Sequence, residues 1–204
     1  FADDHSPNFG IPWVENPSSK EMGTWSKEKL VNYYTFRQQR QLEAVNNPVG
    51  AGWILPAWKD VMDNWSKYQV HIILGGNRST KSTIASRLCM WAAGTIPAAE
   101  VRAYHVNEDR SIEDQQRMIW DAIPLGIRNL PSKKGINHSI QYSQKNGFTD
   151  NICILPPLAG TRRGGTIKFG NYRQYQADAQ VAEGYKAHLI WCDEECPQRM
   201  FETL

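Results

Sequence analysis

The sequence contains little cysteine and no long apolar run. Its four Cys are scattered over 204 residues and do not form a disulfide framework, so a reducing cytosol is the expected setting. No run approaches the roughly 18 apolar residues that a membrane-spanning helix needs, and no signal-peptide pattern opens the chain. We therefore expect a cytoplasmic protein without membrane attachment.

A large excess of charge of one sign is also missing. The 23 Lys and Arg nearly balance the 21 Asp and Glu, for a net charge of +2, so any contact with nucleic acid must come from local patches. Eight Trp, eight Tyr and six Phe supply bulky side chains for a core. This composition excludes disorder, collagen or a coiled coil as a description of the whole chain.

Residues 1–54 are expected to form an N-terminal arm and a helix. Residues 1–24 are rich in Pro, Ser, Asn and Asp and lack periodicity, which indicates an extended arm with Trp13 as a candidate anchor. A helix is predicted from an N-cap at Ser26 to about Asn46. It ends before three helix-breaking residues, Asn47, Pro48 and Gly50.

Strands and helices alternate over residues 55–204. The expected strands are Val70–Leu74, Val101–Val106 and Ala187–Cys192, with shorter candidates at His138–Tyr142, Asn151–Leu155 and Thr166–Phe169. The expected helices are an amphipathic one through Trp58, Val61, Met62 and Trp65, one over 81–93, and one over 111–123 capped by Ser111. This alternation predicts an α/β domain with a mainly parallel sheet flanked by helices.

The sharpest signal is a glycine-rich segment, which reads Gly75-Gly76-Asn77-Arg78-Ser79-Thr80-Lys81-Ser82-Thr83. It lies between an expected strand and an expected helix, as a phosphate-binding P-loop requires. Inward-pointing N–H groups and the helix N-terminus favour a polyphosphate there. We therefore expect all nine residues to contact ATP, with Lys81 at the β- and γ-phosphates and the Ser82 hydroxyl on Mg²⁺.

Thr80 departs from the P-loop pattern G-x-x-x-x-G-K-[ST], which has glycine at this position. A β-branched residue tolerates unusual backbone angles poorly and crowds the phosphate with its Cβ. The alternative reading is a glycine turn that only joins the strand to the helix.

Two acidic residues directly follow the last apolar run. Asp193 and Glu194 come after Leu189–Cys192, and the C-terminal end of a buried parallel strand is where α/β sheets bind ligands. Asp193 is predicted to hold Mg²⁺ through its water shell and Glu194 to orient the attacking water. Glu195 is expected to be a first-turn helix acid.

A zinc site is the alternative for His188, Cys192 and Cys196. Their two intervals of four residues do not match the spacing of a zinc-finger pair, and parallel strands often bury Cys as a small apolar residue. We expect these residues to be structural.

Four stretches of the chain resemble the N-terminal ATPase domain of the tailed-phage terminase large subunit, the motor that packages viral DNA. They are HIILGGNRSTKST, VRAYHVNEDRSIEDQQRMIWDAIP, GGTIKFGNYRQYQADAQVAEGYKAHLIWCDEECP and the closing PQRMFETL. The resemblance covers about residues 55–204. It implies an ASCE-type P-loop ATPase with an extra strand between the phosphate-loop strand and the acidic strand.

The resemblance also implies a function, partners and a location. The activity would be hydrolysis of Mg-ATP that drives double-stranded DNA into a procapsid. The partners would be that DNA, further copies in a homo-oligomeric ring, a portal and a small terminase subunit, in the host-cell cytoplasm and outside the mature virion. The family's nuclease domain would lie beyond Leu204, so no nuclease activity is expected.

The family's site residues map onto the two motifs. Lys81 and Ser82 take the Walker A role, Asp193 the Walker B role and Glu194 that of the catalytic glutamate. Arg78 matches a basic position inside the family's loop, where its guanidinium would stabilise charge developing on the γ-phosphate. A plain phosphate contact or a surface salt bridge is an equal alternative for Arg78.

Further contacts are open to more than one reading. Gln69 and Trp58 are candidates for the adenine, or else core and surface residues. Lys133-Lys134 and Arg162-Arg163-Gly164-Gly165 are candidate DNA-phosphate contacts with Tyr172 and Tyr175 as stacking residues, although solvated loops and buried tyrosines are commoner. A helicase-like P-loop ATPase and a degenerate nucleotide-binding assembly module are the alternative functions.

Overall fold

The structure is a computed structural model. It describes residues 10–12, 16–75, 79–128, 130, 138, 140–157, 162–177 and 186–203. Contacts divide the chain into two compact units, Phe1–Ile72 and Ile73–Leu204, whereas the sequence suggested a division after residue 54. Trp13, the candidate anchor, lies outside the described residues.

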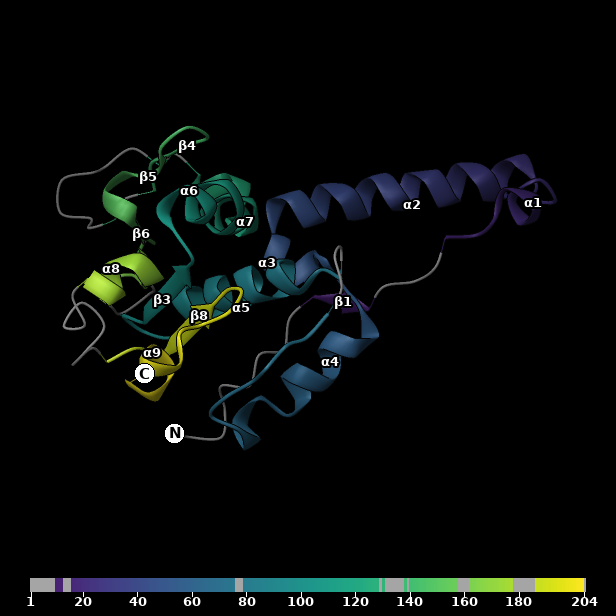
Figure 1. Cartoon of the computed structure of the whole chain (residues 1–204). Coiled ribbons are helices and arrows are strands. Elements are labelled where there is room, and N and C mark those ends of the chain that lie inside the picture. The colour runs from purple at the N-terminus through teal and green to yellow at the C-terminus, as the bar shows by residue number, and fades with distance from the viewer. Residues whose placement is uncertain are drawn as a thin grey trace. The chain divides into compact units, whose positions relative to one another are not determined.

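The first unit is mainly helical (Figure 1). Its helices are α1 (Ser19–Met22), α2 (Lys27–Asn46), α3 (Pro48–Ala51), α4 (Pro56–Asp63) and the 3₁₀ turn η1 (Trp65–Lys67). Two short strands, β1 (Ile11–Pro12) and β2 (Trp53–Ile54), pair in parallel. The sequence did not predict α1, which begins at a capping box between Ser18 and Glu21.

The predicted helix over residues 26–46 is confirmed as α2. The Ser26 side chain accepts a hydrogen bond from the Lys29 N–H at 3.2 Å and so caps the first turn. The chain breaks at Asn47, whose Oδ1 accepts the Gly50 N–H at 3.0 Å and starts α3. No side chain of α2 is buried.

The predicted amphipathic helix is confirmed as α4. Trp58 and Met62, four residues apart and therefore on one face, are buried. The helix ends at Asp63, earlier than expected, and Trp65 begins η1 instead. The Trp65 ring stacks on His71 with the ring centroids 4.5 Å apart.

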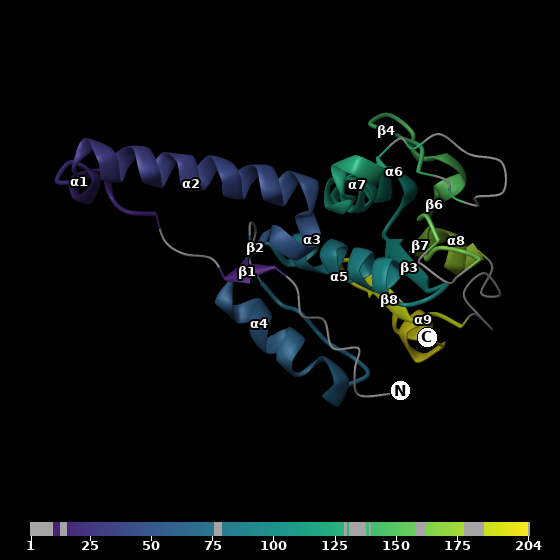
Figure 2. The same ribbon diagram turned by 180° about the vertical axis from the view of Figure 1, so that it is seen from behind.

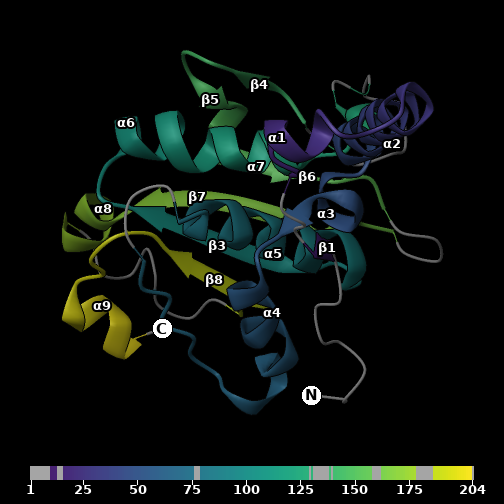
Figure 3. The ribbon, with the colours of Figure 1, turned by 90° about the vertical axis from the view of Figure 1, so that its right-hand side faces the viewer.

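The second unit is built on a four-stranded sheet in the order β6-β7-β3-β8. The strands are β3 (Glu100–His105), β6 (Ile152–Ile154), β7 (Thr166–Asn171) and β8 (Leu189–Cys192). β7, β3 and β8 are parallel and lie side by side in Figure 3, while β6 is antiparallel to β7. The prediction of a mainly parallel sheet flanked by helices is therefore confirmed.

Helices pack along this sheet. α5 (Lys81–Thr95) contacts β3, β7 and β8, and it lies beside α7 (Arg117–Ala122), as Figure 2 shows from behind. α6 (Glu108–Arg110) and a π-helical segment, η2 (Ser111–Gln116), lead into α7. The predicted cap at Ser111 is wrong, because Asn107, four residues earlier, caps the helix by accepting the Arg110 N–H at its side-chain oxygen.

The remaining elements are short. They are η3 (Leu125–Ile127), the hairpin strands β4 (Tyr142–Ser143) and β5 (Gly147–Phe148), η4 (Thr149–Asn151), α8 (Tyr172–Ala177) and α9 (Gln198–Thr203). The strand predicted over 138–142 is confirmed only at Tyr142, where the hairpin supplies a partner strand. None of the helices in the described part of the chain has the length and apolarity that a membrane crossing demands.

The predicted strand Val70–Leu74 is absent from the structure. These residues form no strand, and Ile72 and Leu74 are 77% and 87% exposed. β-branched residues favour a strand only where a neighbouring strand takes up the backbone hydrogen bonds. Among the described residues no strand takes up the backbone hydrogen bonds of this segment. β8 therefore forms the edge of the sheet, where the resemblance implied a further strand.

Within the segment 162–165, Arg163 and Gly165 have structural roles in the fold. The Arg163 guanidinium lies 3.5 Å from Glu100 and donates to the Thr166 hydroxyl at 3.1 Å. A Cβ on Gly165 would lie 2.1 Å from the backbone oxygen of Ala93 in α5. Glycine therefore allows the start of β7 to approach the end of α5 closely.

Gly165→Ala is expected to lower the free energy of unfolding by at least about 2 kcal/mol, because the clash is with backbone and cannot be relieved by a rotamer change. Gly94→Ala is the matched control. This glycine lies in α5, and no atom comes within 4 Å of the position that a Cβ would occupy, so alanine should stabilise by about 0.5–1 kcal/mol. Urea unfolding followed by circular dichroism measures both, and equal stabilities would contradict the close approach.

Candidate functional site

The candidate site lies where β3 and β8 end. Their parallel register pairs Tyr104 with Cys192, and the Asp193 N–H then donates to the Tyr104 carbonyl at 3.0 Å. Side chains alternate between the two faces of a sheet, so His105 and Asp193 share the face opposite to Tyr104. Tyr104 and Cys192 instead pack in a cluster with Tyr172, Tyr175 and Met200.

The first turn of α5 reaches the same place. The Ser82 Oγ lies 3.5 Å from the Asp193 Oδ2, although 111 residues separate the two in sequence. The structure thus brings together the two residues predicted to bind Mg²⁺. Two oxygens so placed suit a hard cation, which prefers oxygen ligands.

The glycine-rich loop, residues 75–80, is folded tightly where it is described. The Lys81 Nζ donates to the Gly75 carbonyl at 3.0 Å. A Cβ on Gly75 would lie 2.5 Å from the Ser79 Oγ, which is buried and has no hydrogen-bond partner within the described part of the chain. Gly76, Asn77 and Arg78 lie outside the described residues.

Two residues of the candidate site have strained backbones. Thr80 has φ +62° and Glu194 has φ +61°, both in the left-handed region, which costs a side-chain-bearing residue about 1–2 kcal/mol. Thr80, at the position where the P-loop pattern has glycine, therefore adopts a conformation that glycine prefers. Such strain is concentrated at functional sites, where the surrounding structure maintains it.

Asp193 is a carboxylate in a poorly solvated position, with its side chain 14% exposed. Burial raises its pKa above the usual range, while His105, the Glu194 N–H and Lys81 counteract part of that shift. The charged form therefore lacks full compensation and would gain from a nearby cation. In the described part of the chain no three His, Cys, Asp or Glu side chains gather as a metal site.

The backbone at Asp193 is held from the far face of the sheet. The Tyr172 hydroxyl donates to the Asp193 carbonyl at 2.7 Å, and the Tyr175 hydroxyl donates to the Arg199 carbonyl at 3.3 Å. Burial raises the pKa of Tyr172, so its hydroxyl remains a donor. Both tyrosines are buried, which favours a structural role for their rings over stacking on nucleic-acid bases.

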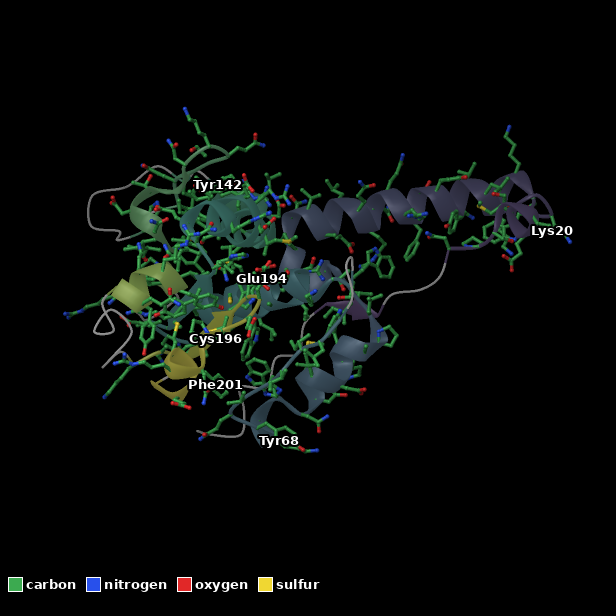
Figure 4. The ribbon with its side chains drawn as sticks, in the orientation of Figure 1. Lys20, Tyr68, Tyr142, Glu194, Cys196 and Phe201 are labelled. Atoms are coloured by element: carbon green, nitrogen blue, oxygen red, sulfur yellow. The ribbon has the colours of Figure 1, made fainter. Side chains whose placement is uncertain are left out.

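The residues of the zinc alternative do not converge on one point. The His188 Nδ1 accepts the Glu100 N–H at 3.0 Å. Cys192 and Cys196 pack against the tyrosine cluster on the segment that runs past the labelled Glu194 in Figure 4. Burial raises the pKa of Cys192 to about 12, which disfavours the thiolate that zinc requires.

His105 was missed by the sequence reasoning. It is 1% exposed, and its Nε2 lies 3.9 Å from the Asp193 Oδ2. The signal that could have found it was its position at the end of a buried strand, since parallel strands bring their C-terminal ends to the same edge of the sheet.

The candidate adenine contacts and one candidate DNA contact remain. Trp58 is buried within the first unit and Gln69 is exposed, so burial favours a core role for Trp58. Lys133-Lys134 lies outside the described residues.

No family model, curated protein or solved structure matches the chain. What bears on function is therefore the geometry of Ser82, Asp193 and their neighbours, together with the sequence resemblance to the terminase ATPase domain.

Thr80→Gly is expected to raise the free energy of unfolding by up to about 1 kcal/mol. Relief of the left-handed strain, about 1–2 kcal/mol, outweighs the extra entropy of glycine in the unfolded chain, about 0.5–1 kcal/mol. Thr80→Val keeps the branched shape without the hydroxyl and should give no gain. Urea unfolding checks this, and a loss of stability in Thr80→Gly would show that side-chain contacts of Thr80 outweigh the strain.

Asp193→Asn is expected to stabilise the chain at pH 7, without Mg²⁺ or nucleotide, by roughly 0.5–2 kcal/mol. Because burial raises the pKa of Asp193, the native state holds this proton more tightly than the unfolded chain does. Wild-type stability therefore falls as the pH rises from the unfolded pKa through the native one. Unfolding curves should show the advantage of Asp193→Asn shrinking as the pH falls toward about 4, and an advantage that grows there would contradict this sign.

Proposed function

We propose that the chain is the ATPase domain of a viral DNA-packaging motor, which binds Mg-ATP at residues 75–83 and hydrolyses it. The observation that carries the proposal is the 3.5 Å approach of the Ser82 Oγ to the Asp193 Oδ2. A hydroxyl at the start of a helix and a carboxylate at the end of a parallel strand are the two protein groups that a P-loop ATPase uses around Mg²⁺.

The donor set fits Mg²⁺ better than a metal enclosed by protein. Mg²⁺ usually keeps several waters and takes one or two protein oxygens together with the phosphates of the nucleotide. Ser82 and Asp193 provide those oxygens, and the raised pKa of Asp193 marks a charge that benefits from a cation. When bound, Mg²⁺ would supply charge neutralisation at the β- and γ-phosphates.

The other residues of the site would act on the nucleotide and on water. Lys81, which donates to the Gly75 carbonyl, would exchange this bond for the β- and γ-phosphates. The N-terminus of α5 adds its partial positive charge. Glu194, exposed and adjacent to Asp193, would orient the attacking water, and Arg78 would stabilise negative charge on the γ-phosphate.

The packaging role depends on the resemblance alone. In this proposal the ATPase works in a homo-oligomeric ring at a portal, with a small terminase subunit, in the host-cell cytoplasm. Its substrate for translocation is double-stranded DNA.

A degenerate nucleotide-binding assembly module is the second candidate. It is favoured by the position of Thr80, whose branched side chain stays in the loop even though the backbone adopts the conformation of a glycine. Such a module would bind ATP without turning it over.

Phosphate release from Mg-ATP tests the proposal. Lys81→Ala should abolish nucleotide binding, and Glu194→Gln should keep binding while turnover falls by about 10²–10⁴, the usual contribution of a general base. Glu195→Gln, an exposed neighbouring acid, is the matched control and should turn over normally. Linear double-stranded DNA should accelerate hydrolysis, less so at higher salt.

Three results would count against parts of the proposal. Unchanged turnover in Glu194→Gln would remove Glu194 from the catalytic role. Binding without turnover, together with turnover restored by Thr80→Gly, would favour the assembly module. A rate of ATP hydrolysis that is the same with and without DNA would support an ATPase but count against the packaging role.

A further inference from the structure

His105 is a buried polar side chain for which the proposed function has no use. It ends β3 on the face that carries Val101 and Ala103, which are fully buried apolar residues. Burying a polar ring costs free energy unless it makes compensating polar contacts. An apolar residue would continue this strand face without that cost, so the contacts of His105 indicate what it does.

The hydrogen bond at one ring nitrogen assigns the proton to the other. The Val106 N–H lies 2.8 Å from the His105 Nδ1 and donates to it. In a neutral imidazole the nitrogen that does not accept carries the hydrogen. The Nε2 therefore carries the hydrogen, and it lies 3.9 Å from the Asp193 Oδ2.

The two oxygens of Asp193 have different partners. Oδ1 accepts the Glu194 N–H at 3.2 Å. Oδ2 faces both the Ser82 Oγ at 3.5 Å and the His105 Nε2 at 3.9 Å. The main chain of Asp193 is also fixed by Tyr104 and Tyr172. The orientation of its carboxylate therefore depends on the Glu194 N–H at Oδ1 and on the groups that face Oδ2.

We propose that His105 is a positioning residue whose Nε2–H orients the Asp193 carboxylate toward Ser82. The Ser82 Oγ and the Asp193 Oδ2 would then be available together to the Mg²⁺ that accompanies the nucleotide. The inference rests on the proposed Mg-ATP site and adds a residue from outside both sequence motifs. Groups that orient a metal-binding side chain in this way typically contribute 10–100-fold to metal affinity.

Binding of a fluorescent ATP analogue to the full chain, with Mg²⁺ and with EDTA, tests the inference without relying on activity. His105→Leu fills the space but lacks the N–H, and we expect the Mg²⁺-dependent gain in affinity to fall 10–100-fold while affinity in EDTA is unchanged. His105→Gln carries an amide N–H at about the same reach as Nε2 and should restore most of the gain. Thermal unfolding without ligand shows whether each variant is folded.

The outcomes separate this inference from the proposed function. If wild type gains no affinity from Mg²⁺, or Lys81→Ala binds as wild type does, the Mg-ATP site itself is wrong and the role of His105 is lost with it. If wild type and Lys81→Ala behave as proposed but His105→Leu keeps the full Mg²⁺ effect, only the His105 role is overturned. Equal losses in His105→Leu and His105→Gln would show that His105 is structural.

Discussion

The parallel pairing of β3 with β8 is the constraint on which the candidate site depends. With Tyr104 opposite Cys192, the next residues of both strands, His105 and Asp193, fall on one face at the same edge of the sheet. A shift of one residue would turn Asp193 toward the tyrosine cluster and Cys192 toward α5, because strand side chains alternate in direction. The hydrogen bonds from Asp193 to Tyr104 and from Tyr172 to Asp193 hold that register at the strand end.

Local signals in the sequence predicted the elements that local interactions determine. Ser26 caps α2, α5 begins at Lys81, and β8 ends just before Asp193, as expected. The prediction of a strand over 70–74 was wrong because apolar residues alone do not provide the neighbouring strand with which a strand must form hydrogen bonds. His105 was missed for a related reason, since its importance arises only from the register of two strands that lie far apart in sequence.

Strain and desolvation meet at this site and work against stability. Thr80 and Glu194 occupy left-handed backbone conformations, and the carboxylate between α5 and the end of β8 is held where water reaches it poorly. If Mg-ATP binds as proposed, part of these costs around Ser82 and Asp193 would be offset by the binding of that charged ligand.

The close approach at Gly165 also has a consequence for alignment. α5 is a helix of 15 residues, about 22 Å long at 1.5 Å per residue. Gly165 lies against it near its last turn, at Ala93. Ser82 is carried at the opposite end. A rigid helix that is displaced at one end tilts, so a wider gap at Gly165 would change the angle at which α5 places the Ser82 hydroxyl near Asp193. A substitution at Gly165, which contacts the C-terminal end of α5, would therefore also change the distance between the Ser82 Oγ and the Asp193 Oδ2 at the other end of the helix.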